Sequence, residues 1–307
     1  MPWWQENKRS LATKLKSHKA KSTKNGPSHK PHYIIYPYYL MSNLSDKVIW
    51  ITGASSGIGE ALAYELAARN NVKLILSARR KDALENVKNN CLKSAHANIQ
   101  TLPLDLSQSH TLQDITQQAI TLFGHIDILV NNGGVGQRSL IQDTSLDVDR
   151  QLMEVNYFGT IALTKYLLSH FIKRKTGYYV TVSSLAGKVG TPLRSGYAAA
   201  KHALHGFFDS LRAEHWKDNI RVTMICPGFI LTQLSAKALT GQGTPQQTMD
   251  KSKYHKRSPE WCAQKIVKAM ERQREEVYLG GKEILVVYIK RFFPTLFSKI
   301  IRKVAVR

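Results

Sequence analysis

The stretch from Lys47 to Arg69 reads KVIWITGASSGIGEALAYELAAR. Residues 47–52 form a mainly apolar, β-branched run, which is typical of a buried strand, and residues 60–69 are rich in helix formers. Between them, three glycines stand in the spacing G-x-x-x-G-x-G. Strand, glycine turn and helix in this order predict the start of a βαβ unit that holds the phosphates of a dinucleotide.

Each glycine of the turn has a different expected structural role. We expect the first to permit a tight turn, the second to let backbone approach a pyrophosphate, and the third to let the helix pack close to the strand. The neighbouring serines add hydroxyl donors beside the phosphates. The predicted phosphate-binding residues are Gly53, Ser55, Ser56, Gly57, Ile58 and Gly59.

The next apolar run, Val72–Ala78, predicts a second strand that ends in Arg79 and Arg80. At about this distance an acidic residue would bind the ribose hydroxyls of NAD, and no carboxylate stands there. Arginine pairs with a 2′-phosphate, so the sequence favours NADP(H) over NAD(H). The alternative is that both arginines are solvated loop charges.

The rest of the chain alternates between helical and strand patterns without a linker. This alternation predicts an α/β fold with a doubly wound parallel sheet of the Rossmann type, in one domain over residues 46–280. The expected helices cover residues 82–95, 108–123, 146–174, 196–217 and 259–271, and the expected strands cover 99–104, 126–131, 178–182, 220–225 and 277–279.

The net charge of +22 is concentrated at the two ends of the chain. Residues 1–45 carry eight Lys and Arg against one acid, and residues 282–307 carry seven against one. Because the excess is peripheral and no nucleic-acid module is recognisable, we expect no nucleic-acid partner. Residues 1–45 form an expected disordered, basic extension, within which Tyr33–Met41 is either an interfacial anchor or part of a segment upstream of a functional start at Met41.

Apolar and basic groups interleave in the tail, residues 281–307. We expect this tail to cap the mouth of a substrate cleft or to pack in a dimer, with its cations in water. The alternative is binding to an anionic membrane surface.

The three cysteines share no close spacing, so no metal site and no disulfide framework is predicted. Free thiols suit a reducing compartment. No apolar run has the length of a membrane span, and no signal peptide is recognised. We therefore expect a cytoplasmic protein, with peripheral membrane association through the tails as the alternative.

Tyr197 and Lys201 stand four residues apart, which places both on one face of a helix. An unperturbed tyrosine is a poor acid or base at neutral pH, and a neighbouring cation favours its phenolate. The pair therefore indicates a proton-transfer centre, against the alternative of an ordinary exposed pair.

With these residues in place, the chain resembles the short-chain dehydrogenase/reductase family over residues 48–280. Four separated signatures carry the resemblance: TGASSGIG at residues 52–59, NNGG at 131–134, the set Ser184, Tyr197 and Lys201, and PGFILT at 227–232. The run from Leu185 to Tyr197 is also similar to the subgroup of dehydrogenase/reductase member 7. NNGG departs from the usual NNAG by one methyl, and we expect the smaller residue to be tolerated with some added flexibility.

The resemblance implies the roles of the catalytic residues. Tyr197 would be the general acid and base, and Lys201 would lower its pKa and hold the nicotinamide ribose. Ser184, thirteen residues before the tyrosine, would bind the substrate oxygen, whereas Ser183 would be structural. Asn156 would hold a water near the lysine in a proton relay.

The resemblance also implies further cofactor contacts. Asp105 would accept a hydrogen bond from the adenine, its alternative being a carboxylate in a turn. Asn132 would lie along the cofactor. Pro227 and Gly228 would place backbone against the nicotinamide, and Thr232 would bind its carboxamide or the pyrophosphate.

Together these features predict an NADP(H)-preferring oxidoreductase that transfers a hydride between nicotinamide and a carbonyl or secondary alcohol. Residues 229–258 would form a lid whose leucines and alanines favour an apolar substrate. The helices at 146–174 and 196–217 resemble those through which the family forms homodimers or homotetramers. The alternatives are a non-catalytic dinucleotide-binding protein, a peripheral membrane protein, and a sugar-nucleotide epimerase, whose usual G-x-x-G-x-x-G spacing is absent.

Overall fold

A computed structural model of the protein describes residues 43–249 and 257–302. The predicted anchor Tyr33–Met41 and all but three residues of the predicted extension 1–45 lie outside this part of the chain.

The centre of the fold is a seven-stranded sheet in the order β3-β2-β1-β4-β5-β6-β7. All neighbouring strands run parallel. This confirms the predicted doubly wound sheet, in which the strand order changes direction between β1 and β4 and opens a crevice at the carboxyl ends. The strands are β1 Val48–Thr52, β2 Lys73–Ser77, β3 Ile99–Thr101, β4 Ile128–Asn131, β5 Gly177–Val182, β6 Ile220–Pro227 and β7 Glu276–Leu279.

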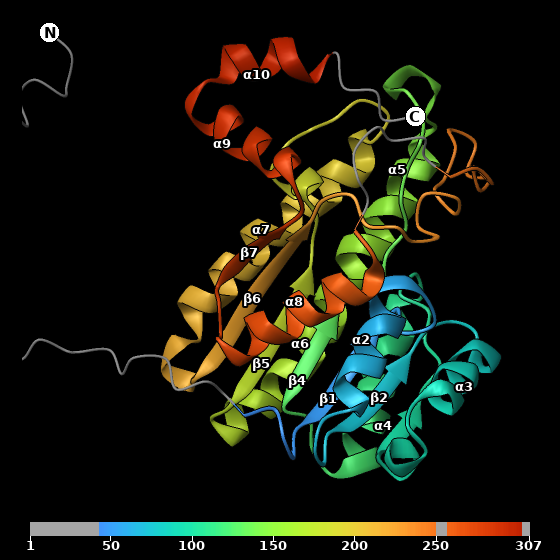
Figure 1. The fold of residues 1–307 in the computed structure, drawn as a ribbon, viewed down its shortest axis with the longest axis vertical. Helices are drawn as coiled ribbons and strands as arrows, with labels where there is room; N and C mark the ends of the chain where they lie inside the picture. Colours follow the sequence, from blue (N-terminus) through green and yellow to red (C-terminus); the bar gives the residue numbers. More distant parts are fainter. Residues whose placement is uncertain (1–42, 250–256, 303–307) are drawn as a thin grey trace, which may run out of the picture. The chain divides into compact units, whose positions relative to one another are not determined.

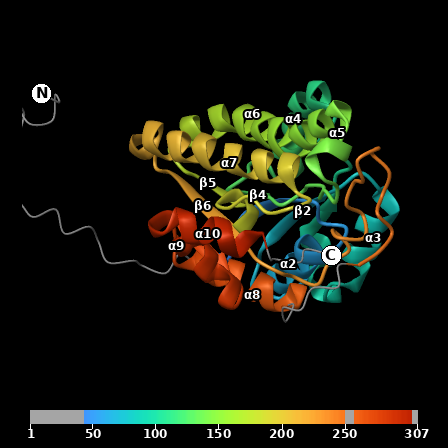
Figure 2. The ribbon, with the colours of Figure 1, turned by 90° about the horizontal axis from the view of Figure 1, so that it is seen from above.

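Helices cover both faces of the sheet (Figures 1 and 2). One layer contains α2 Gly57–Ala67, α3 Lys81–Asn90 and α8 Pro259–Glu271, and the other contains α4 Leu112–Phe123, α5 Leu146–Met153, α6 Gly159–Arg174 and α7 Ser195–Glu214. Two separate hydrophobic clusters lie between the sheet and these two layers.

Strand β1 shows why the sheet is buried on both faces. Its residues are fully buried, with Ile49 and Ile51 in one hydrophobic cluster and Val48 and Trp50 in the other. Successive side chains of a strand point to opposite faces, so a continuous apolar run supplies both cores. Each such side chain contributes roughly 1.5–3 kcal/mol through burial.

Two predicted helices are shorter than expected. The helix predicted over residues 82–95 ends at Asn90, and a separate 3₁₀ turn covers Lys93–Asn98. The asparagines at this end are poor helix formers, which explains the early end. The helix predicted over 108–123 begins only at Leu112, after the 3₁₀ turn Ser109–Thr111.

The long helical stretch predicted over 146–174 is divided by a π-turn, Glu154–Phe158, between α5 and α6. The glycine that opens α6 packs against backbone: a Cβ on Gly159 would lie 2.2 Å from the Leu106 carbonyl oxygen. The turn and the close approach bring the interior of this stretch against the carboxyl end of the sheet. Asn156, in the middle of the π-turn, is buried there.

Beyond β7, the tail forms two short helices, α9 Leu285–Phe292 and α10 Pro294–Ile301. They follow the carboxyl end of β7 and lie together at that end of the sheet (Figure 1). Over residues 43–249 and 257–302, none of the helices has the length and apolar character needed to cross a membrane.

Candidate active site

A pocket of about 850 Å³ lies at the carboxyl ends of the strands. Ligand pockets are typically about 300–1,000 Å³, so this one has the size to hold a cofactor or substrate. Every predicted site residue except Gly59 lines it: Gly53, Ser55, Ser56, Gly57, Ile58, Arg79, Asp105, Asn132, Asn156, Ser184, Tyr197, Lys201, Pro227, Gly228 and Thr232.

The glycine turn between β1 and α2 has no room for side chains. Gly53 has φ 66°, and a Cβ on it would lie 2.7 Å from the Gly133 Cα. A Cβ on Gly59 would lie 2.2 Å from the Gly53 carbonyl oxygen, so this glycine packs behind the turn instead of lining the pocket. Ser56 is the N-cap of α2 but makes no side-chain capping hydrogen bond. Its hydroxyl and the amino end of α2 therefore suit a phosphate group.

Thr52 and Asn132 fasten the turn to the neighbouring strand. The Thr52 Oγ1 accepts hydrogen bonds from the Asn132 and Gly133 backbone amides, both at 3.0 Å. The Asn132 Nδ2 donates to the carbonyl oxygens of Thr52 and Gly53 at 3.1 and 3.2 Å. Asn132 thus fixes the conformation of the turn. Thr52 was not among the predicted site residues, and only its position directly before the first glycine could have indicated its role.

Arg79, Arg80 and Asp105 also line the pocket. Both arginines are exposed, and Arg80 lies 3.7 Å from the Asp82 carboxylate. Asp105 Oδ1 accepts hydrogen bonds from the backbone amide and the hydroxyl of Ser107 at 3.0 and 2.8 Å. Asp105 therefore shapes a turn and lines the pocket at the same time, so the two interpretations of this residue are compatible.

Tyr197 and Lys201 lie one turn apart on α7, with the lysine Nζ 5.9 Å from the centre of the tyrosine ring. Both side chains are buried. The Tyr197 backbone amide donates to Gln137 Oε1 at 3.1 Å, which fixes the start of α7. The Lys201 Nζ donates to the Val182 carbonyl oxygen at 2.9 Å, at the end of β5.

Burial controls the ionisation of this pair. It raises the pKa of Tyr197 above its ordinary value, while a hydrogen bond with Ser184 and the charges of Arg194 and Arg138 act to lower that pKa. Burial also lowers the pKa of Lys201 to about 8. The sequence predicts a lowered pKa for Tyr197. In the structure, desolvation raises this pKa more than Ser184, Arg194 and Arg138 together lower it, so these groups do not produce the predicted shift.

Ser184 and Ser183 follow β5 but face different surroundings. The Ser184 Oγ lines the pocket, accepts from the Ala186 amide at 3.1 Å and donates to the Pro227 carbonyl oxygen at 3.4 Å. Ser183 also lines the pocket, but its Oγ lies 3.0 Å from His205 Nε2 and donates to the Lys201 carbonyl oxygen at 3.4 Å. The hydrogen bonds give Ser183 a structural environment and leave Ser184 beside Tyr197.

Next to Ser183, the potential metal-ligating atoms of His205, Cys226 and Glu276 lie within 4.8 Å of one another. The sequence spacing gave no sign of this cluster, because three different elements supply it. The Lys188 Nζ lies 2.6 Å from Glu276 Oε2, so a cation already neutralises the carboxylate. Burial raises the pKa of the Cys226 thiol to about 12, which disfavours the thiolate that a metal needs.

Asn156 uses its side chain to hold the loop after β4. Its Oδ1 accepts from the Val135 amide, and its Nδ2 donates to the carbonyl oxygens of Val135 and Leu152, all at 3.0 Å. A Cβ on Gly134 would lie 2.5 Å from Asn156 Oδ1 and 3.7 Å from Lys201 Nζ, so these groups are close neighbours. Such π-turns occur frequently at functional sites.

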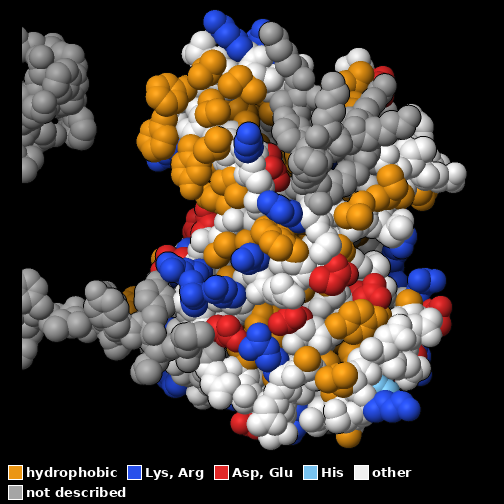
Figure 3. Space-filling view, in the orientation of Figure 1, with side chains coloured by type: hydrophobic (Ala, Val, Ile, Leu, Met, Phe, Trp, Pro, Cys, Tyr) orange, Lys and Arg blue, Asp and Glu red, His pale blue; other side chains and the backbone are white. Residues whose placement is uncertain are grey.

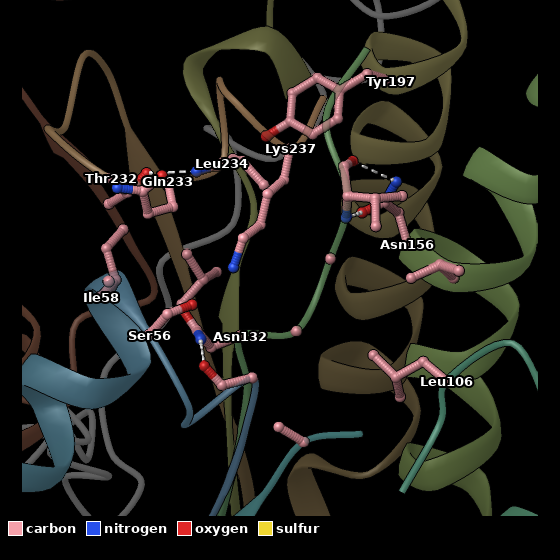
Figure 4. Close-up of a pocket in the computed structure, with 18 of the residues that line it drawn as sticks. Ser56, Ile58, Leu106, Asn132, Asn156, Tyr197, Thr232, Gln233, Leu234 and Lys237 are labelled. Atoms are coloured by element: carbon pink, nitrogen blue, oxygen red, sulfur yellow. Dashed lines mark hydrogen bonds between the residues drawn. The ribbon is translucent and has the colours of Figure 1, made fainter. Parts of the chain in front are cut away.

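The lid brings one predicted side chain, Leu234, to the pocket together with Gln233 and Lys237, which the sequence did not indicate as binding residues. Gln233, Leu234 and Lys237 line it, and Lys237 extends from the lid into the space between Tyr197 and Asn132 (Figure 4). Thr232 lies over the glycine turn, where a Cβ on Gly57 would come 3.1 Å from its Cγ2. A lysine in a lid has no sequence signal of its own.

Comparisons with known proteins agree with this geometry. A family model described as short chain dehydrogenase matches residues 47–243. The human protein Dehydrogenase/reductase SDR family member 7 is 44% identical over 257 residues, which cover 82% of this chain and 76% of the human one.

Two solved structures share the fold. A short chain dehydrogenase/reductase from Burkholderia phymatum in complex with NAD matches with a TM-score of 0.73 and 22% identity, covering 83% of this chain and 96% of its own. An alcohol dehydrogenase from Thermococcus sibiricus complexed with 5-hydroxy-NADP matches with a TM-score of 0.65 and 25% identity, covering 77% and 97%.

Proposed function

Because the chain belongs to the short-chain dehydrogenase/reductase family and is an oxidoreductase acting on alcohol and carbonyl groups, we propose that it prefers NADP(H) and reduces or oxidises an apolar substrate. Tyr197 is the proposed general acid and base. The observation that carries this proposal is that Ser184, Tyr197 and Lys201 line the same pocket as the glycine turn.

A nicotinamide dinucleotide fits the residues of the pocket. The turn at Gly53 and Gly57 offers backbone without side chains, and the uncommitted Ser56 hydroxyl lies at the amino end of α2. When bound, the cofactor supplies or accepts a hydride at C4 of its nicotinamide. Asp105, Pro227 and Gly228 line the same pocket, which supports the proposed contacts of Asp105 with the adenine and of the Pro227 and Gly228 backbone with the nicotinamide.

The catalytic residues act on the substrate oxygen. In reduction, the Tyr197 hydroxyl donates its proton to the carbonyl oxygen, to which Ser184 donates a hydrogen bond. In oxidation, Tyr197 takes the proton back. Lys201 supplies a positive charge and holds ribose hydroxyls, and Asn156 holds the loop after β4 in position near the lysine.

Substitution of Tyr197 by Phe tests this assignment. We expect turnover to fall by roughly 10²–10⁴-fold while NADPH binding, followed by its fluorescence, is retained. Tyr64→Phe is the matched control, because the Tyr64 hydroxyl bonds Glu60 outside the pocket. Unchanged turnover in Tyr197→Phe would refute the proposed acid and base.

The NADP(H) preference rests on Arg79 and Arg80 at the adenine end of the pocket. In Arg79→Asp, the dissociation constant of NADPH should rise by roughly 10–100-fold, as expected for the loss of a charge-assisted hydrogen bond, and that of NADH should change little. Arg272→Asp, an exposed change at the C-cap of α8 and outside the pocket lining, is the control. An equal effect on both cofactors would contradict the preference.

The apolar substrate class rests on Val155, Ile230, Leu234 and Leu239, which line the pocket. A screen of carbonyl compounds and alcohols, with oxidation of NADPH and NADH followed in parallel, tests it directly. Higher kcat/KM for polar sugars than for apolar carbonyls would contradict it.

We also propose a cytoplasmic protein that forms a homodimer or homotetramer through the outer surfaces of α5, α6 and α7. Leu146, Phe158 and Tyr166 are 69%, 46% and 38% exposed there, and an interface would bury them. Light scattering should give a multiple of the 34.7 kDa chain mass, and Phe158→Glu should reduce it. A monomeric wild-type protein would contradict this assembly.

A further inference from the structure

The tail helices α9 and α10 expose a continuous apolar stripe. Leu285, Tyr288 and Phe292 stand at positions i, i+3 and i+7 of α9 and are 59%, 49% and 68% exposed. Phe293 and Leu296 continue the stripe into α10, at 61% and 49% exposed. The three residues of α9 share one helix face. With Phe293 and Leu296, five large apolar side chains of α9, α10 and the turn between them are exposed. Figure 3 shows hydrophobic side chains gathered at this end of the molecule.

Cations flank the stripe. Between residues 282 and 302 the chain carries five Lys and Arg and a single acid, Glu283. Arg291, Lys299 and Arg302 are exposed, whereas the Lys290 Nζ donates to the Lys188 carbonyl oxygen at 2.8 Å. A helix pair with large exposed apolar groups and a strongly basic border is typical of an interfacial membrane segment.

The tail is attached to the domain but does not close the pocket. The Lys290 hydrogen bond and an edge-to-face contact between Tyr278 and Tyr288 hold α9 against the body. None of the described tail residues, 282–302, lines the pocket, so the expected capping of the cleft stays a prediction. Tyr288 therefore has an aromatic partner in Tyr278, whereas Leu285, Phe292, Phe293 and Leu296 present roughly half or more of their surface to solvent.

We propose that α9 and α10 form a docking surface for an anionic lipid membrane. The basic residues around the stripe favour an anionic membrane over a second copy of the chain as the partner of this surface. A copy would bring the same basic border against the first, whereas anionic headgroups neutralise the border while the acyl region takes the apolar stripe.

The location of the surface links it to the pocket. Tail residue Glu283 lies beside Gly228 of the pocket wall, where a Cβ on that glycine would come 2.6 Å from Glu283 Oε1. The lid residues Leu231 and Leu234 are 52% and 41% exposed. A membrane bound by α9 and α10 therefore lies near the edge of the sheet at which the pocket opens, and an apolar substrate dissolved in that membrane has a short route to it.

Vesicle sedimentation of the full chain tests the surface. We expect binding to vesicles of phosphatidylcholine and phosphatidylserine but not to phosphatidylcholine alone. Arg291→Glu should weaken the partition coefficient roughly 30-fold, since each charge near an anionic surface changes it about five-fold and the reversal counts twice. Phe292→Ser should weaken it roughly ten-fold through lost apolar burial.

The matched controls are Trp216→Ser and Lys217→Glu, an adjacent aromatic and basic pair at the start of β6, the opposite end of the parallel sheet from α9. Trp216 has the same 68% exposure as Phe292. The proposal requires these controls to bind like the wild type. It is overturned if the wild type does not bind anionic vesicles, if the tail variants bind as well as the controls, or if Phe292→Ser lowers the molecular mass in solution, which would assign the stripe to a second copy.

Discussion

Replacement of Lys201 by Met measures how much the buried ammonium group lowers the free energy of unfolding. The Lys201 side chain is buried and its pKa falls from the ordinary 10.5 to about 8 because of desolvation. At 1.36 kcal/mol per unit, the charged form is disfavoured by about 3 kcal/mol at pH 7. Methionine is of similar length and carries no charge, but it leaves the Val182 carbonyl oxygen without the Lys201 donor, which costs roughly 1–3 kcal/mol at every pH.

The sign of the pH dependence follows from proton binding. Between about pH 8 and 10.5, the unfolded wild-type chain holds the Lys201 proton more tightly than the folded protein does, so its free energy of unfolding rises with pH. Below pH 8 the full penalty remains. Relative to Lys201→Met, the wild type should therefore gain about 2.5 kcal/mol between pH 7 and pH 10.

Urea unfolding of both proteins at pH 7, 8, 9 and 10, followed by circular dichroism, measures this difference. Other titrating groups are common to both proteins and largely cancel, and the nearby Cys226 thiol, with its pKa raised to about 12, stays protonated over the range. If the unfolding free energies of the two proteins changed with pH in parallel, the inference that Lys201 is a buried ammonium with a lowered pKa would be refuted. Turnover is also expected to be lost in Lys201→Met, but the stability measurement does not depend on it.

Three further changes have defined outcomes. Gly59→Ala places a methyl against the Gly53 carbonyl oxygen, so NADPH affinity should fall at least ten-fold and the melting temperature should drop; wild-type binding by calorimetry would contradict the close packing. Ser184→Ala removes a hydrogen bond that lowers the Tyr197 pKa, so the pH profile of kcat/KM should move upward, and an unmoved profile would contradict the contact. Desolvation acts to raise the pKa of Glu276, but hydrogen bonds with His205, Lys188 and Tyr278 outweigh it and hold that pKa at about 2. The wild type should therefore lose about 1 kcal/mol more stability than Glu276→Gln between pH 5 and pH 3, after allowance for solvent screening, and equal acid unfolding curves would contradict this.

The sheet could be predicted because each strand is a short apolar run bounded by polar or glycine residues. Strand β1 was placed to within one residue, since its two buried faces require continuous apolar side chains. Helix ends were predicted less well. Asn90 ends α3 and the π-turn interrupts the helical stretch around Asn156, and both depend on local hydrogen bonding that a periodic pattern does not contain.

The pocket residues could be predicted where one sequence segment contains the whole signal. The glycine turn and the pair Tyr197 and Lys201 are such segments, and the structure brings them to one pocket. The ionisation of the pair was not predictable, because desolvation of Tyr197 depends on side chains from several elements. The cluster of His205, Cys226 and Glu276 was missed for the same reason.

The glycine at position 133 shows how packing reverses a conclusion drawn from one residue. A missing methyl suggests added flexibility beside the cofactor site. In the structure, a Cβ at this position would lie 2.7 Å from Leu106 Cδ1, so the leucine already fills the space that a methyl would need. The Gly133 amide also donates to the Thr52 hydroxyl at 3.0 Å. Because the neighbouring side chains fill the space and hold the backbone, this segment is fastened to the glycine turn without the methyl, and the expected flexibility does not follow from the smaller residue.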